Sequence, residues 1–286
     1  MREEIITIGQ HSVVGILTSN GPHETLPTIV MVNAGLIHRI GPNRIYVKLA
    51  RSLASCGFRV FRYDSGANGD STKTGADTEM ECMKKVMDHL EKKLQHSEFV
   101  ILGMCSGAEL ACKAALNDTR IRGIVMINGA GLSKGKISSL YPHSEDMIRR
   151  RYYLNAIYQP RKWLKLISLR QITPSFKKIV GILARLFVKS YKHVATDPSS
   201  EIADPFTELS KNKVRILLII SEGSIVHDIL SLSGVDFKKN DYIFLKGVDH
   251  TITPLWAQEE LKIHITAWLS NIFKPKNLTH MQHDRT

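Results

Sequence analysis

The stretch that decides the fold is EFVILGMCSGA, residues 98–108, in which an apolar run leads into a cysteine bracketed by glycines. A buried strand that enters a sharp turn and then a helix exposes the side chain at the turn, where it can act as a nucleophile. Such a turn needs small residues two positions before and two positions after the exposed one. With Cys105 at the turn, these positions hold Gly103 and Gly107. With Ser106 at the turn, one of them would hold a methionine, so the spacing favours Cys105. The alternative is a glycine turn beside a buried structural cysteine.

Strand and helix patterns alternate along the rest of the chain. Apolar and β-branched runs predict eight strands, at 5–9, 12–19, 28–35, 58–64, 99–103, 121–128, 214–220 and 241–246. Helical spacing of apolar residues predicts helices at 43–56, 79–94, 106–116 and 254–272. The first two strands are separated by a polar turn, as in a hairpin. The alternation predicts an α/β fold with a mostly parallel eight-stranded sheet and helices on both faces.

The candidate reactive residues all follow predicted strands. Cys105 follows one strand, residues 33–35 end another, Glu222 and Asp228 follow a third, and His250 follows the last. In a parallel α/β sheet, reactive groups collect at the carboxyl ends of the strands. We therefore expect these residues to converge.

His250 is the candidate base for the cysteine. A cysteine attacks as the thiolate and needs a base or a positive neighbour. His250 lies in LKGVDHTITP, after the last predicted strand and before the last helix. The alternative is a surface histidine hydrogen-bonded to Asp249.

Backbone N–H groups near the turn are candidates for an oxyanion hole, which stabilises negative charge developing on a substrate oxygen. One is the N–H of Ser106, the residue after the nucleophile. The other is expected from Gly35 or Leu36, in the loop NAGLIHRIGPNR. The alternative for this loop is a plain connection between a strand and a helix.

Motifs along the chain carry a resemblance to a known family. They are HRIGPNR (38–44), FRYDSGANGDS (61–71), GMCSGAELA (103–111), RRRYYLNAIYQPRKW (149–163), SEG (221–223) and VDHTITP (248–254). With these pieces the chain resembles the α/β-hydrolase superfamily, specifically the serine-aminopeptidase-like group. Within that group it is similar to a cysteine-elbow branch found in bacterial natural-product and exopolysaccharide gene clusters. The resemblance implies the α/β-hydrolase fold with a helical lid.

The chain departs from this family at the acid. Members carry Asp at the position that Ser224 occupies here. Asp228, four residues on, is the first substitute, and Glu222 is the second. A third possibility is a Cys–His dyad without an acid, because cysteine is far more acidic than serine and depends less on an orienting carboxylate.

Charged residues also surround the predicted oxyanion loop. Asp64 and Asp70, in RYDSGANGDS, are expected to tie down the loop that follows their strand. His38 and Arg39 either brace the oxyanion loop or contact an acyl or phosphate group.

The positive charge of the chain is concentrated in one insertion. The net charge is +12, and residues 134–200 hold 14 lysines and arginines against 3 acidic residues. We expect an α/β-hydrolase core over 1–132 and 206–273, a basic helical lid over 133–205 and a polar tail over 274–286. The lid would dock an acyl-carrier protein or coenzyme A phosphates, with a solvated cap or a membrane surface as alternatives.

Composition excludes several classes of protein. No run of 18 uncharged apolar residues is present, so no stable membrane insertion is expected. The start, MREEIITIG, lacks the basic and apolar regions of a signal peptide, which predicts a cytoplasmic protein. Four cysteines without metal-ligand spacing predict free thiols, and no metal or cofactor is expected. No motif for nucleic acid accompanies the charge.

Three functions are consistent with the sequence. The first is a thioesterase-like acyl hydrolase or acyltransferase of bacterial secondary metabolism, acting on an acyl thioester or ester through Cys105 and His250. The second is hydrolysis of a simple ester or lactone, or elimination of a carboxylic acid from an O-acylated intermediate. The third is a catalytically impaired binding protein, which the serine at position 224 favours.

Overall fold

A computed structural model describes most of the predicted core. The described residues are 1–9, 13–21, 25–35, 37–66, 68–72, 78–131, 205–227, 230 and 240–274. The chain divides into two compact units, residues 1–132 with 203–286 and residues 133–202, and every described residue belongs to the first. The predicted lid up to residue 204 and the predicted tail beyond Lys274 lie outside the described residues.

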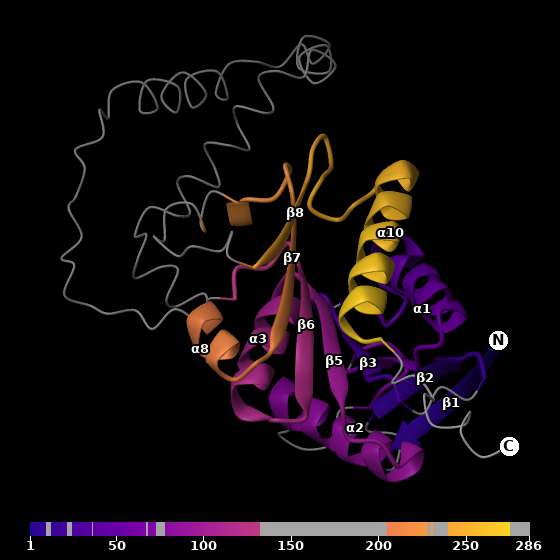
Figure 1. Ribbon diagram of the computed structural model, residues 1–286. Helices are drawn as coiled ribbons and strands as arrows, with labels where there is room; N and C mark the ends of the chain where they lie inside the picture. The colour runs from indigo at the N-terminus through magenta and orange to yellow at the C-terminus, as the bar shows by residue number, and fades with distance from the viewer. Residues whose placement is uncertain are drawn as a thin grey trace, which may run out of the picture. The chain divides into compact units, whose positions relative to one another are not determined.

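One eight-stranded sheet runs through the described unit (Figure 1). Its strands, in chain order, are β1 (Arg2–Ile8), β2 (Val13–Ser19), β3 (Thr28–Val32), β4 (Val60–Asp64), β5 (Phe99–Met104), β6 (Ile121–Ile127), β7 (Arg215–Ser221) and β8 (Asp241–Leu245). Their order across the sheet is β1-β2-β4-β3-β5-β6-β7-β8. Strand β2 is antiparallel to β1 and β4, and every other pair is parallel. The predicted starting hairpin and the mostly parallel sheet are confirmed.

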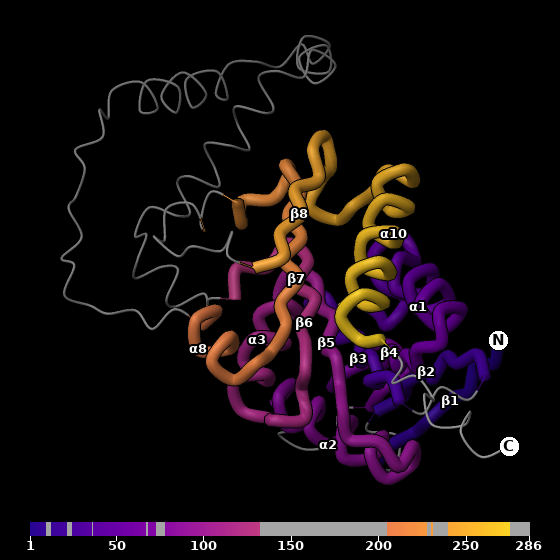
Figure 2. Tube along the Cα trace, viewed as in Figure 1, coloured from indigo at the N-terminus to yellow at the C-terminus, as the bar shows by residue number. Residues whose placement is uncertain are grey.

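Helices cover both faces of this sheet. They are α1 (Ile45–Ser55), α2 (Glu79–Leu94), α3 (Ser106–Asn117), α8 (Pro205–Lys211) and α10 (Leu255–Ile272), with a short 3-10 turn at Pro42–Arg44. Helices α1 and α10 pack against each other and share one apolar core with the sheet, whereas α3 contacts α2 and α8 (Figures 1 and 2). Among the helices that the structure describes, none is both long and apolar enough to cross a membrane.

Local signals explain the predicted helices. Helix α2 begins with a capping box, in which Thr78 accepts a hydrogen bond from the N–H of Glu81 and the carboxylate of Glu81 accepts one from the N–H of Thr78. Its buried residues Met83, Val86 and Leu90 recur at three- and four-residue spacing, so one stripe of the helix faces the core. Helix α8 was not predicted separately, because it falls where the lid was expected to end.

Candidate active site

Cys105 occupies a strained turn between β5 and α3. Its backbone angles are φ 54° and ψ −119°, in a region that residues with side chains rarely adopt. Its N–H donates to the carbonyl of Ile127, at the end of neighbouring β6, over 2.8 Å. The Cys105 side chain is exposed. The structure therefore has the strand, sharp turn and helix expected from the sequence, with the cysteine rather than Ser106 at the strained position.

The two flanking glycines are required by close backbone contacts. A Cβ atom on Gly103 would lie 2.2 Å from the carbonyl oxygen of Gly107. A Cβ atom on Gly107 would lie 2.5 Å from the carbonyl oxygen of Asn33, at the end of β3. Real Cβ atoms do not approach backbone oxygens so closely, so any side chain at either position would open the turn. The spacing rule applied to the sequence has this steric origin.

The hydroxyl of Tyr46 links the ends of β3 and β5 next to the turn. Its hydroxyl donates to the carbonyl of Val32, at the end of β3, over 3.0 Å. The same oxygen accepts the N–H of Met104, the residue before the cysteine, over 3.1 Å. Burial raises the pKa of Tyr46, so the hydroxyl keeps its proton and can donate. The sequence placed this residue in a helix but gave no sign of this role.

The predicted oxyanion donors lie beside the turn. Gly35, with φ 59°, donates its N–H to the Oγ of Ser106 over 2.8 Å. Ser106 is the first residue of α3, where backbone N–H groups have no partner within the helix. Leu36 lies outside the described residues. The structure thus brings Gly35 and Ser106 together, and their role toward a substrate stays a prediction.

The loop that carries His250 is fixed to the ends of β6 and β7 through Asn128. The amide nitrogen of Asn128 donates to the carbonyl of His250 over 2.8 Å. Its amide oxygen accepts the N–H of Ser221 over 2.8 Å and the hydroxyl of the same serine over 3.1 Å. Asn128 follows the residue to which Cys105 is hydrogen-bonded. His250 therefore lies at the same end of the sheet as the cysteine, as the topology predicted.

The imidazole of His250 contacts Ser224. Its Nδ1 lies 3.1 Å from the Oγ of Ser224, which is 1% exposed and follows β7. Glu222, the second candidate acid, is exposed and accepts the N–H of Gly247 over 2.7 Å. Asp228, the first candidate acid, lies outside the described residues. At the position where the resemblance implied an acid, the structure places a serine hydroxyl against the histidine.

Asp249 does not take the role of hydrogen-bond partner to His250 that the alternative interpretation gave it. Its carboxylate accepts both the N–H and the hydroxyl of Thr251 and of Thr253, at 2.6 to 3.2 Å. Burial opposes ionisation of Asp249, but these hydrogen bonds outweigh it and lower its pKa. Burial also lowers the pKa of His250, and the nearby charge of Asp249 opposes this in part. Burial therefore favours the neutral imidazole, which is the form that can accept a proton.

Gln258 supports the same loop from α10. It is 3% exposed, and its amide nitrogen donates to the carbonyls of Ile252 and Thr253 at 3.0 and 3.3 Å. Its amide oxygen accepts from Lys48 of α1 over 2.6 Å. The backbone after His250 is therefore hydrogen-bonded to both helices on this face of the sheet.

On the other side of the turn, a charged network holds the loop of Gly35. The side chain of Asp64 is fully buried at the end of β4 and is ion-paired with Arg39, whose backbone N–H also donates to it over 2.6 Å. Asp70 pairs with the same guanidinium at 2.5 Å. Asn33 donates to Asp64 over 3.3 Å. Burial lowers the pKa of Arg39, but the two carboxylates outweigh it and raise the pKa overall.

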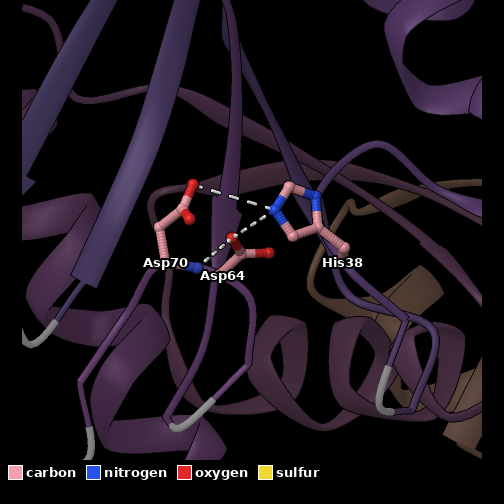
Figure 3. Close-up of side chains that lie close together, drawn as sticks. All are labelled: His38, Asp64 and Asp70. Carbon is pink, nitrogen blue, oxygen red and sulfur yellow. Dashed lines mark hydrogen bonds and ion pairs between the residues drawn. The ribbon is translucent and has the colours of Figure 1, made fainter.

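His38, Asp64 and Asp70 lie close enough together to suggest a metal site, since their ligand atoms all fall within 4.8 Å of one another (Figure 3). The guanidinium of Arg39 lies within this group, however, with Nη1 2.9 Å from the Nε2 of His38 and paired with Asp64. It already places a positive charge between the carboxylates. We therefore assign the cluster to bracing the loop, one of the two roles expected for His38 and Arg39.

Three residues support the site without any sign of these contacts in the sequence pattern. Tyr46, Asn128 and Gln258 each bond backbone groups far away along the chain, which spacing alone does not show. One local signal was available for Asn128: it is a polar residue at the end of an apolar strand, and the structure gives it a φ of 51°.

Comparisons with known proteins agree with this architecture. Residues 28–159 match the protein family described as "alpha/beta hydrolase fold". No curated protein matches the sequence. Similar solved structures include a carboxylesterase of the thaumarchaeon Nitrososphaera gargenis, with TM-score 0.56, 16% identity and coverage of 94% of this chain and 100% of that chain. A proline iminopeptidase of Mycobacterium smegmatis has TM-score 0.57, 16% identity and coverage of 94% and 98%. An esterase of Pyrococcus furiosus has TM-score 0.57, 14% identity and coverage of 95% and 90%. At such identities the similarity shows the fold.

Proposed function

From the premise that this chain belongs to the α/β-hydrolase superfamily, we propose that it is an acyl hydrolase or acyltransferase whose nucleophile is Cys105. The observation that carries the proposal is the strained backbone of this cysteine, with φ 54° and ψ −119°, between two glycines that admit no side chain. A structural cysteine needs no such geometry. Strain of this kind persists only where the surrounding structure enforces it, and it is found at functional sites.

The reaction divides into two steps. In the first, Cys105 Sγ forms a bond to the acyl carbonyl carbon while the thiol proton passes to Nε2 of His250. The N–H groups of Ser106 and Gly35 stabilise the oxyanion, and the carbonyl re-forms as the leaving group departs and takes the proton from Nε2. In the second step, Nε2 takes a proton from water or an acceptor alcohol, whose oxygen bonds to the acyl carbon. The bond from this carbon to Sγ then breaks, and Sγ takes the proton back from Nε2 as the thiol is released.

Before substrate binds, the N–H of Gly35 donates a hydrogen bond to the Oγ of Ser106 over 2.8 Å. A substrate oxygen would therefore replace the serine hydroxyl as the acceptor of this N–H. This exchange costs little, because the N–H of Gly35 stays paired and the hydrogen bond of Ser106 that is released is solvent-exposed, so water can replace it. The same serine thus keeps the donor satisfied until a substrate arrives.

The acyl group would be held as a thioester or an ester. Cysteine suits thioester exchange, because the attacking and the leaving sulfur are alike. We extend the proposal to an acyl-carrier protein or coenzyme A as the carrier, on the support of the excess of basic residues over 134–200. Reversing several of these charges should then raise KM for the carrier-bound substrate alone. The resemblance of the motifs is the support for a place in bacterial secondary metabolism.

Replacement of the cysteine tests the proposal. We expect Cys105→Ala to abolish hydrolysis of a p-nitrophenyl ester and of an acyl thioester, measured with purified protein. Cys56→Ala removes the other exposed cysteine that the structure describes and is the matched control, which should keep full activity. Activity in Cys105→Ala equal to that of the control would overturn the assignment.

A further inference from the structure

Ser224 stands where the resemblance implied an acid, and its hydroxyl is rigidly placed. The side chain is buried, and its N–H donates to the carbonyl of Ser221 over 2.9 Å. The N–H of Val226 donates to its Oγ over 3.3 Å. The same Oγ lies 3.1 Å from Nδ1 of His250. Backbone on both sides of Ser224 therefore fixes the oxygen that the histidine meets.

Among the described residues, no carboxylate is hydrogen-bonded to the ring of His250, whose loop is fixed by other contacts. Its carbonyl is held by Asn128, and the turn after it is held by Asp249 through Thr251 and Thr253. The carboxylate of Asp249 is directed at these threonines. With Nδ1 occupied by the Ser224 hydroxyl, Nε2 is the ring nitrogen left to exchange a proton with a nucleophile.

We propose that Ser224 is the positioning residue of this site, whose hydroxyl oxygen accepts a hydrogen bond from Nδ1–H of His250 and so leaves Nε2 unprotonated. The inference rests on the proposed function, because it assigns Nε2 the thiol proton of Cys105. The hydroxyl orients the ring as a carboxylate would, but it adds no negative charge.

A neutral hydrogen-bond partner of His250, such as the Ser224 hydroxyl, limits the class of substrate that the site can hydrolyse. A carboxylate stabilises the imidazolium that forms during reaction, and removing it from such a pair is costly for amide hydrolysis. A thioester makes smaller demands, because its leaving group departs as a thiolate, which is stable near neutral pH, whereas an amine must be protonated as it leaves. In the part of the chain that the structure describes, the ring of His250 has this hydroxyl as its hydrogen-bond partner, which suits thioesters and activated esters better than peptide or amide bonds.

The charges around the histidine are consistent with a neutral resting state. The described titratable groups on its own loop and at the neighbouring strand ends are Asp249, Lys246, Glu222, His227 and Cys105, and Lys48 is hydrogen-bonded to the Gln258 that supports the loop. Of these, Asp249 raises the pKa of the imidazole, but burial outweighs it and the net direction is down. The net effect thus favours the uncharged ring, which can take up the thiol proton.

Nitrogen NMR of the full-length protein tests the tautomer without depending on activity. With 15N-histidine labelling and assignment by the loss of signals in His250→Gln, we expect His250 at pH 7 to be neutral with its hydrogen on Nδ1. In Ser224→Ala the preference for this tautomer should fall, and in Ser224→Asp the pKa of His250 should rise. A hydrogen on Nε2 in the wild type, or no change in Ser224→Ala, would overturn the inference.

Kinetics provide the second measurement. Ser224→Ala should lower kcat for an acyl thioester about tenfold with little change in KM, as expected when a base is misaligned while substrate binding is unaffected. Ser71→Ala is the matched control: Ser71 is also buried, accepts the N–H of Val14 over 2.8 Å and donates to the carbonyl of Asp64 over 2.7 Å. It should lose stability but keep the pH profile of kcat. Equal kcat and pH profiles for the Ser224 and Ser71 variants would overturn the inference.

The two proposals fail differently. If Cys105→Ala keeps activity, the proposed function fails whatever tautomer His250 adopts. If Cys105→Ala is inactive but the hydrogen lies on Nε2, only the role of Ser224 fails.

Discussion

The two loops that flank Cys105 are held in place by different chemistry. On the side of β3 and β4, the loop of Gly35 is held by ion pairs of Arg39 with Asp64 and Asp70. On the side of β7 and β8, the loop of His250 is held by hydrogen bonds of amides, hydroxyls and a carboxylate that faces the backbone. From this difference we infer that ion pairs fix the Gly35 loop, whereas His250, the proposed base, is held by hydrogen bonds at a place where burial lowers its pKa.

The largest expected effect is the loss of kcat when His250 is replaced. We expect His250→Ala to lower kcat by roughly a thousandfold, because a positioned base contributes factors of that order to proton transfer. Hydrolysis of an acyl thioester measures it. His264→Ala removes an exposed histidine that pairs with Glu260 on α10, and it should leave kcat unchanged. A His250→Ala protein as active as the His264→Ala control would place the base elsewhere.

The next effect is a loss of stability when the ion pair between Arg39 and Asp64 is broken. We expect Arg39→Ala to lower the free energy of unfolding by about 3–5 kcal/mol, because it leaves the buried carboxylate of Asp64 without its ion partner. Urea denaturation measures it. Arg122→Ala breaks an exposed pair with Glu98 and should cost at most about 1 kcal/mol. Unchanged stability together with lost activity in Arg39→Ala would show that the guanidinium serves the substrate instead.

A third variant tests how the loop of His250 is attached to the ends of β6 and β7. We expect Asn128→Ala to lower kcat roughly tenfold to a hundredfold, because a displaced base loses alignment with the nucleophile. It should also destabilise the protein by about 1–3 kcal/mol, since Ser221 and the carbonyl of His250 lose a partner. Asn117→Ala removes an exposed amide bonded to Lys113 and is the control. A loss of stability without loss of kcat would limit Asn128 to a structural role.

The smallest effect is a pH dependence of stability. Because burial lowers the pKa of His250 in the folded state, the folded protein resists protonation more than the unfolded chain does. The stability associated with the neutral imidazole is therefore complete above the unfolded value, about 6.5, and is lost as the pH falls below it. Between pH 7.5 and 5, wild-type stability should fall more than that of His250→Gln. Parallel curves for the two proteins would contradict a half-buried histidine whose folded-state pKa is lowered.

The sequence predicted what depends on local spacing. The turn at Cys105 needs glycines two residues away on each side, and alternating apolar periods give the sheet and its helices. Both signals lie within short windows of the chain. The charged network was also predictable in part, because the sequence predicts that Asp64 and Asp70 tie down a loop and gives bracing as one of two roles for Arg39.

The contacts that hold His250, the proposed base, could not be predicted from local spacing. Ser224 and His250 are 26 residues apart, and Asn128 and His250 are 122 apart, so only the packing of β6, β7 and β8 brings them together. In the sequence, Ser224 stands where the resemblance implies an acid, and Asp228 and Glu222 are the nearby carboxylates that could replace it. A hydroxyl can accept the hydrogen bond that a carboxylate would accept. This possibility could be recognised for Ser224 only once the structure placed its Oγ next to the imidazole of His250.

The most direct test of the account is the site of acyl transfer. Brief incubation with a short-chain acyl thioester, followed by rapid acid quench and peptide mass spectrometry, locates the covalent intermediate. The account predicts a single acyl group on Cys105, accumulating further in His250→Ala if the second step is slowed more than the first. An acyl group on the neighbouring Ser106, whose hydroxyl lies 2.8 Å from the N–H of Gly35, would contradict it.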